Sequence, residues 1–104
     1  MIQIYAEIFG VTEKEITSEK RTRLLSDVRK IISYRLRQDG LTLKEIGYII
    51  NRHHSAVINA IKQYKDLVND PEFKTKIEQV NLEIKRRSTH CRQLTTKLIT
   101  LKNQ

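Results

Sequence analysis

The sequence contains little cysteine, proline, glycine or aromatic side chain. Among its 104 residues are one cysteine, one proline, three glycines and no tryptophan. The single cysteine, Cys91, cannot form an intramolecular disulfide, which fits a reducing compartment but does not require one. No apolar run approaches the roughly 18 residues that a membrane-spanning helix needs, and the first residues lack the basic region of a signal peptide. We therefore expect a cytoplasmic protein with no membrane partner.

Positive charge, by contrast, is abundant. Lysine and arginine number 20 against 12 aspartates and glutamates, which gives a net charge of +8 and a pI near 9.8. Such an excess favours a polyanionic partner, either nucleic acid or an anionic membrane surface, although a well-solvated basic protein has the same composition. A chain of this length is about one domain and has room for a single modest core.

Apolar residues recur at helical spacing along most of the chain, which predicts an all-α fold. A short amphipathic helix over residues 2–9 ends at Gly10. A longer helix over residues 24–36 ends before Gly40. Between them, the run T-E-K-E at residues 12–15 has the capping-box pattern that begins a brief helix.

A second capping box, Thr42 with Glu45, opens a pair of short helices. The apolar face that follows stops at residues 51–52, and a new apolar stripe runs over residues 57–68. Two short helices joined by about three polar residues have the layout of a helix-turn-helix. A glycine inside the first helix, Gly47, would let the two helices approach closely.

Asp70 and Pro71 mark the start of a long final helix, with Asp70 as its cap and Pro71 in its first turn. Residues three and four positions apart then form a coiled-coil seam that is interrupted at Arg87. The seam positions are Ile77, Val80, Ile84, Arg87, Cys91, Leu94, Leu98 and Leu101. We therefore divide the chain into a helix-turn-helix domain over residues 1–70 and a long helix over residues 71–104. That helix is a possible coiled coil, through which the chain would form a homodimer or bind another partner.

Two adjacent histidines, His53 and His54, stand at the start of the second helix of the pair. Recognition helices read bases with their N-terminal residues, and an imidazole can donate to a phosphate or to a base acceptor. Neighbouring helix positions point about 100° apart, so the two histidines make a poor metal pair, and His90 with Cys91 adds no ligand spacing. An ordinary helix-end residue remains the alternative for either histidine. No catalytic motif accompanies them, so we expect no enzyme, no metal and no cofactor.

Three runs of the sequence resemble one family closely. They are SEKRTR at residues 18–23, LTLKEIG at 41–47 and RHHSAVINAI at 52–61. Together they resemble the carboxy-terminal DNA-binding domain, domain IV, of the bacterial replication initiator DnaA, a helical bundle with a helix-turn-helix that is related in shape to Trp repressor. The resemblance extends over about residues 5–80. It implies sequence-specific binding of double-stranded DNA, in replication initiation or its regulation, by a protein of bacterial or phage origin.

The resemblance also implies which residues contact DNA. In this family a basic loop places an arginine in the minor groove, and the tip of the second helix reads the major groove. The implied base contacts are Arg21, in the minor groove, and His53, His54, Ser55 and Ala56, in the major groove. The expected phosphate contacts are Lys20, Arg23, Arg29, Arg37, Lys44, Arg52, Asn59 and Lys62.

Two positions depart from the family's pattern. His53 replaces an aspartate that would accept a hydrogen bond from a cytosine amine, and Ala56 replaces a threonine. The sequence therefore supports the DNA-binding mode more strongly than it supports the family's usual target sequence. A G-x-x-x-x-G-K-[ST] motif is also absent, so we expect no nucleotide binding.

Two other functions fit parts of the sequence. A protein-interaction module or a transcription regulator on a helix-turn-helix scaffold would use the coiled-coil seam, although it would not need the His-His-Ser tip. An RNA-binding variant is less well supported, because the four tyrosines and two phenylalanines form no visible stacking platform.

Overall fold

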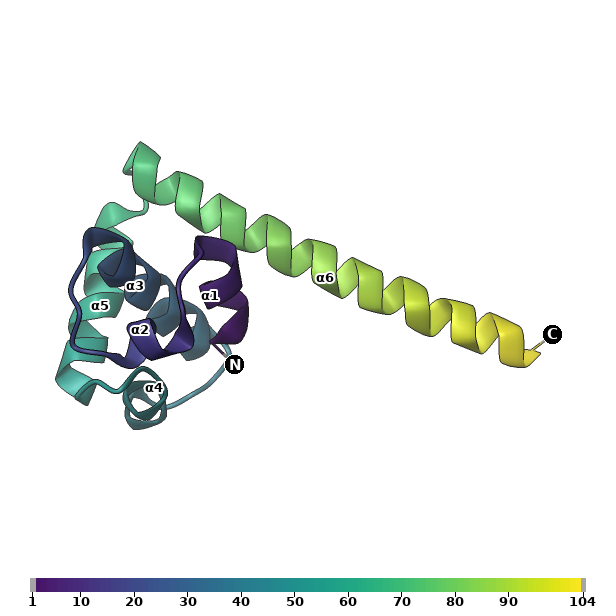
Figure 1. Ribbon diagram of the computed structural model, residues 1–104, viewed down its shortest axis with the longest axis horizontal. Coiled ribbons are helices and arrows are strands. Elements are labelled where there is room, and N and C mark those ends of the chain that lie inside the picture. Colours follow the sequence, from purple (N-terminus) through teal and green to yellow (C-terminus); the bar gives the residue numbers. More distant parts are fainter. Residues whose placement is uncertain (1, 104) are drawn as a thin grey trace.

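The computed structural model describes the backbone of residues 2–103 and the side chains of residues 2–87. Its described residues form α-helices and no β-strand, which confirms the all-α fold. The helices are α1 (Gln3–Phe9), α2 (Glu13–Thr17), α3 (Arg23–Gln38), α4 (Leu43–Ile50), α5 (His54–Leu67) and α6 (Pro71–Asn103). Figure 1 shows α1 to α5 gathered in one bundle, with α6 lying against α1 at its edge. The predicted helix-turn-helix corresponds to α4 and α5.

Helix ends fall where the sequence places its cap residues. Gly10 ends α1 with a left-handed backbone, φ 68°, which a residue with a Cβ rarely adopts. Thr12 and Glu15 form a complete capping box at the start of α2, and Thr42 and Glu45 form another at the start of α4. Both predicted boxes are therefore confirmed.

The centre of the core is α3. Its side chains Val28, Ile31 and Ile32 are completely buried, and Leu36 one turn later is 3% exposed. This spacing of three and four residues puts them on one side of the helix, where α3 packs mainly against α5 and also contacts α1, α2 and α4. Because α5 is held against α3 by one face, its opposite face is left at the surface.

A glycine and a left-handed residue make the turn between α4 and α5 tight. Asn51 ends α4 with φ 57° and ψ 53°, and the Arg52 N–H then donates to the Gly47 carbonyl at 2.7 Å. A Cβ on Gly47 would lie closer to the Arg52 carbonyl oxygen than van der Waals contact allows. The glycine therefore permits a close contact between helix and turn, rather than the helix–helix contact that the sequence suggested.

The hydrophobic core continues past residue 70 into α6. Asp70 caps this helix as predicted, because its Oδ1 accepts a hydrogen bond from the Glu72 N–H at 2.9 Å. Phe73 and Val80 of α6 are 3% and 0% exposed and belong to the same buried cluster as the α3 side chains. The Phe73 ring meets the Tyr64 ring edge-on, with centroids 5.5 Å apart. The domain boundary that the sequence suggested at residue 70 therefore lies inside the packed structure, because residues on both sides of it share one core.

The first part of the predicted coiled-coil seam also faces the domain. Ile77 and Ile84 are partly buried against the core. Arg87 donates to Glu7 of α1 at 2.7 Å and to Glu83 at 3.0 Å, so a residue that interrupts the apolar seam instead joins two helices of the chain. The side chains of the remaining seam positions lie outside the described residues; they are Cys91, Leu94, Leu98 and Leu101.

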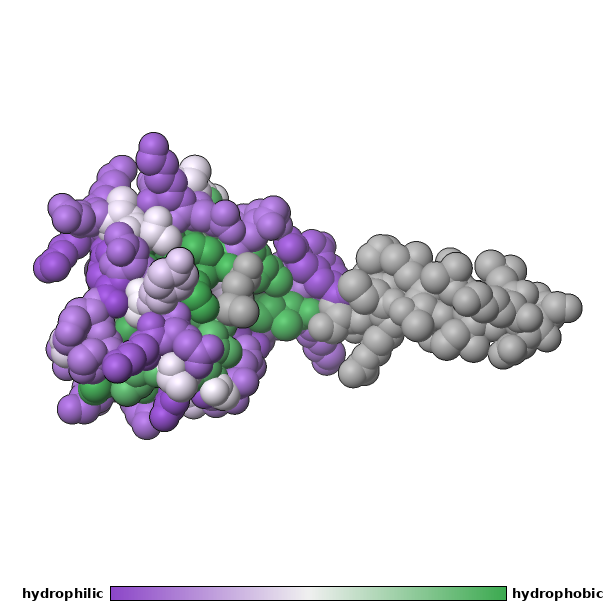
Figure 2. Space-filling view, turned by 90° about the horizontal axis from the view of Figure 1, so that it is seen from below, coloured by the Kyte–Doolittle hydropathy of each residue, from purple (hydrophilic) through white to green (hydrophobic). Residues whose placement is uncertain are grey.

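Polar and apolar residues are unevenly spread over the face of the domain that Figure 2 shows. Figure 2 shows one face on which hydrophilic residues cover much of the domain and hydrophobic residues gather in the middle. No helix in the described part of the chain is both long enough and apolar enough to cross a membrane. Within the same part, no three side chains of histidine, cysteine, aspartate or glutamate are grouped so that they could hold a metal ion.

Candidate nucleic-acid interface

The tip of α5 is open to solvent and is capped by a histidine. His53 precedes the helix, and its Nδ1 accepts a hydrogen bond from the Ser55 N–H at 3.2 Å. The same nitrogen lies 2.9 Å from the Ser55 Oγ, and the His53 and His54 ring centroids are 4.2 Å apart. All residues from His53 to Ala56 are exposed. The predicted start of the helix is therefore confirmed, and the side chains predicted to contact bases in the major groove lie together on one surface.

The outer face of α5 extends this surface along the helix. Val57 and Tyr64 are 0% and 7% exposed and face the core. Ala56, Asn59 and Lys62 are exposed, because positions three and four apart share a side of an α-helix. The residues predicted to face outwards therefore form one strip that begins at the tip.

The basic loop between α2 and α3, residues 18–22, is tied to the helix-turn-helix through its backbone. Arg52 Nη2 donates to the Ser18 carbonyl at 2.6 Å, and Asn51 Nδ2 donates to the Thr17 carbonyl at 3.1 Å. Both donors belong to the turn between α4 and α5. These two bonds hold the loop next to the tip of α5.

Arg29 supports this loop from the interior, which corrects its predicted position at the surface. Its side chain is only 7% exposed. The guanidinium donates three hydrogen bonds to backbone carbonyls, those of Ile16 at 2.8 Å, Glu15 at 3.0 Å and Ser18 at 3.0 Å. Burial lowers the pKa of Arg29, and the positive charges of Arg52 and Arg21 lower this pKa further. Arg29 was predicted to face phosphate, but its hydrogen bonds are instead used to shape the loop.

A cleft of about 330 Å³ opens between the loop, α3 and α5, and we refer to it as the basic cleft. Its positive charge comes from four lining residues, Arg21, Arg29, Lys30 and Arg52, and no acidic side chain among residues 2–87 lines it. Ala56 and Asn59 contribute the wall that belongs to the exposed strip of α5. A positively charged hollow beside an exposed helix suits a phosphate of a nucleic-acid backbone.

Comparison with known proteins agrees with this arrangement. The sequence matches the family described as "Bacterial dnaA protein helix-turn-helix" over residues 1–63. The chain belongs to this family. It is 32% and 34% identical, over 71 residues each, to the chromosomal replication initiator proteins DnaA of Thermosipho africanus and Thermosipho melanesiensis. It is 35% identical over 81 residues to that of Lachnoclostridium phytofermentans.

The DnaA helix-turn-helix family supports DNA binding as the function of this domain. The three matches cover 67–75% of the chain but only 16–18% of the length of those relatives. The family match ends within α5, so the last turn of α5 and all of α6 lie outside it.

Five of the phosphate contacts expected for a DnaA-like domain lie outside the basic cleft. Three of these side chains bond within the chain: Lys20 to Glu15 at 3.6 Å, Arg23 to Glu72 at 3.0 Å and Arg37 to the Leu41 carbonyl at 2.9 Å. The other two, Lys44 and Lys62, are exposed. The structure therefore brings Arg21, Arg52 and Asn59 together in one hollow, whose lining does not include these five.

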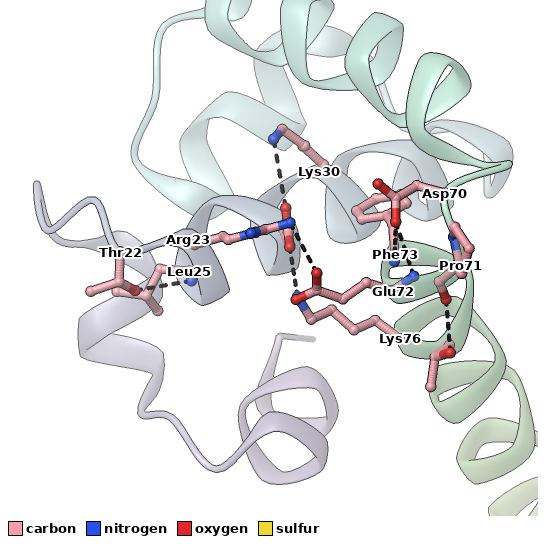
Figure 3. Close-up of polar contacts among 11 residues, drawn as sticks. Thr22, Arg23, Leu25, Lys30, Asp70, Pro71, Glu72, Phe73 and Lys76 are labelled. Atoms are coloured by element: carbon pink, nitrogen blue, oxygen red, sulfur yellow. Dashed lines mark hydrogen bonds and ion pairs between the residues drawn. The ribbon is translucent and has the colours of Figure 1, made fainter.

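Lys30 is a cleft residue that the sequence did not single out. Its Nζ lies 3.7 Å from Oδ1 of Asp27, a carboxylate that is 6% exposed and bonds on its other side to Lys76 of α6 at 2.7 Å (Figure 3). Ser26, four residues before Lys30 on α3, lines the same cleft. The spacing of four residues between Ser26 and Lys30 could have suggested that both lie on one side of α3. The sequence does not show, however, which side of α3 adjoins α5.

Proposed function

We propose that the chain binds double-stranded DNA sequence-specifically, with the tip of α5 in the major groove and the loop over residues 18–22 at the adjacent minor groove. The observation that carries this proposal is the basic cleft, in which Arg21 of the loop and Asn59 of α5 line one hollow. A single phosphate backbone separates neighbouring grooves of a duplex. A strand lying in the cleft would therefore leave the loop in one groove and the helix in the other.

Each group of side chains then has a distinct role. His53, His54, Ser55 and Ala56 read base edges in the major groove, and Arg21 enters the minor groove. Lys30 and Arg52 hold the strand in the cleft. The exposed cations outside the cleft contact flanking phosphates; they are Lys20, Arg23, Arg37, Lys44 and Lys62.

The biological setting that we propose is replication initiation or its regulation. The relatives are named as chromosomal replication initiator proteins, and the chain resembles a small part of each. Origin recognition by the DNA-binding surface is the part of that activity which this domain would perform.

Selection of binding sites from randomised duplexes tests the proposal, followed by alanine variants on the selected duplex. Replacing both His54 and Ser55 removes base contacts worth about 1–3 kcal/mol each, so discrimination against non-specific DNA should collapse. Lys62→Ala should weaken all duplexes alike and reduce the salt dependence by about one unit, while sequence preference survives.

Lys65→Ala is the matched control, because Lys65 is exposed in the last turn of α5 and lies farther from the tip of the helix than Lys62 does. It should change affinity less than Lys62→Ala does. Unchanged preference after the double replacement of His54 and Ser55 would mean that α5 does not read bases.

Association through α6 is the second candidate function, and Leu82 favours it. This side chain is 69% exposed on α6, a helix whose sequence continues the seam of apolar residues towards Leu101. A chain that ends at residue 80 keeps the core residues Phe73 and Val80 and lacks Leu82. Sedimentation should show the full chain as a dimer and the shortened chain as a monomer. A full chain that is monomeric at high concentration would reject this role.

A further inference from the structure

α6 lies outside the family match, yet its first turns contact the basic side of the domain. Glu72 Oε2 accepts a hydrogen bond from Arg23 Nη2 at 3.0 Å (Figure 3). Arg23 is the first residue of α3 and directly follows the basic loop that carries Arg21. The two paired side chains are 74% and 58% exposed, so the ion pair is open to exchange with an anion from solution.

The backbone at Glu72 is held in place, and Lys76 lies beside its carboxylate. The Glu72 N–H donates to the capping carboxylate of Asp70, and the next side chain, Phe73, is 3% exposed in the core. One turn later, Lys76 Nζ lies 2.7 Å from the buried Asp27 carboxylate and 3.9 Å from Glu72 Oε1. Figure 3 shows these contacts joining α6 to α3. Glu72 is therefore a preorganised acceptor, whereas Arg23 has a long side chain that can turn away from it.

We propose that Glu72 competes with a DNA backbone phosphate for Arg23, and that α6 thereby lowers the affinity of the domain for every duplex. This inference rests on the proposed function. A guanidinium binds carboxylate and phosphate oxygens with the same fork of N–H donors, so one anion can replace the other. When Arg23 turns to phosphate, Lys76 remains 3.9 Å from Glu72 and keeps that carboxylate paired.

The competition has two measurable consequences. Exposed ion pairs are weak, so removal of the competition by Glu72 should tighten DNA binding by about two- to five-fold and not by orders of magnitude. The gain should be the same on a selected and on a random duplex, because phosphate contacts carry no sequence information. The slope of log affinity against log salt should steepen by up to about 0.9, since Arg23 would no longer exchange one protein anion for a DNA anion.

The test uses the full chain and the variant Glu72→Gln, which removes the charge and keeps the size of the side chain. Affinity is measured for one selected and one random duplex over a series of salt concentrations. Glu78→Gln is the matched control: Glu78 is an exposed acid on the same helix, and it forms no ion pair within the described part of the chain. We expect tighter binding and a steeper slope from Glu72→Gln, and a smaller change in both quantities from Glu78→Gln.

Arg23→Gln and the double variant complete a thermodynamic cycle. If Arg23 is the group for which the two anions compete, Glu72→Gln should have no more effect than Glu78→Gln once Arg23 is glutamine. Equal effects of Glu72→Gln and Glu78→Gln would overturn the inference in favour of general electrostatics, as would an effect of Glu72→Gln that is undiminished without Arg23. Failure of the unaltered chain to bind any duplex would instead overturn the proposed function itself.

Discussion

At the residue scale, His53 both caps the start of α5 and presents a hydrogen-bonding group at the helix tip, where we propose that bases are contacted. Its Nδ1 accepts from the Ser55 N–H, so in the neutral ring the proton is on Nε2, and Nε2–H is the donor left for DNA. A donor selects base acceptors, such as N7 and O6 of guanine. His53 should therefore favour an acceptor-bearing base where an aspartate would favour an amine.

Replacing His53 by aspartate tests this difference. Aspartate is also a good N-cap, so α5 should still form, but its carboxylate can only accept hydrogen bonds. Binding-site selection should therefore give a changed preference at one position, from guanine, whose major-groove edge carries only acceptors, to cytosine or adenine, whose amines donate, with about 1–3 kcal/mol of discrimination. His53→Asn is the control that can cap, donate and accept. Identical selected sites for the unaltered chain and His53→Asp would contradict the assigned role.

Gly47 limits what the turn can tolerate. Alanine there would gain about 1 kcal/mol of helix propensity, but its Cβ would overlap the Arg52 carbonyl oxygen, which is backbone and cannot simply rotate away. We expect Gly47→Ala to destabilise the fold by about 1–3 kcal/mol in urea unfolding, because overpacking forces backbone shifts. Tyr48→Ala on the same helix removes a side chain that is 90% exposed and should stay within about 0.5 kcal/mol. Equal stability of the two variants would show that the turn adapts freely.

At the scale of elements, the two capping boxes make α2 and α4 sensitive to acid. The pKa of Glu45 is below its ordinary value of 4.5, because its carboxylate accepts hydrogen bonds from the Thr42 N–H and hydroxyl. The pKa of Glu15 is lowered mainly by the equivalent bond from the Thr12 N–H. A lowered pKa means that the stabilisation is present above pH 4.5 and is lost as the pH falls through the lower, folded-state value.

Glu45→Gln should therefore make stability less dependent on pH in the acid range. Glutamine can still accept from the Thr42 N–H, as the capping box requires, but it does not titrate. Thermal unfolding between pH 3 and pH 6 measures the effect, since about this range brackets the ordinary titration of a glutamate. Glu78→Gln removes a carboxylate that caps no helix and serves as the control. A pH profile that Glu45→Gln leaves unaltered would argue against the box as its source.

The sequence was sufficient to locate the helices because their ends are local features. The Thr-x-x-Glu boxes and Gly10 each act within a few residues, and all were found where the pattern predicted. The surface against which α6 packs was not predictable in this way. The same spacing of apolar residues is found in a helix of a coiled coil and in a helix that packs against its own domain. Asp27 and Lys76 are 49 residues apart, and neither position suggests the other without the fold. Arg29 was misplaced for the same reason, since its acceptors are backbone carbonyls of another element.

At the scale of the whole molecule, α6 should be part of the cooperative unit that folds. Phe73→Ala removes a ring that is 3% exposed and contacts Tyr64, so we expect a loss of about 3–5 kcal/mol in the free energy of unfolding. Leu82→Ala, at a side chain 69% exposed on the same helix, should cost no more than about 0.5 kcal/mol. Urea titration of both variants makes the comparison. A Phe73→Ala variant as stable as the Leu82→Ala variant would mean that α6 docks without contributing to the core.

In the proposed binding mode, one backbone oxygen fixes the separation between the minor-groove and major-groove parts of the DNA site. The Ser18 carbonyl accepts from Arg52 of the turn and from Arg29 of α3, so the loop and the tip of α5 are fastened to a common point. Inserting one base pair between the minor-groove and major-groove parts of a site would move them about 3.4 Å apart along the axis and rotate them by about 35°. The two hydrogen bonds at the Ser18 carbonyl oppose such a displacement. We therefore expect the minor-groove and major-groove parts of a target site to have a fixed spacing. Inserting even one base pair between them should prevent the protein from binding both parts at once.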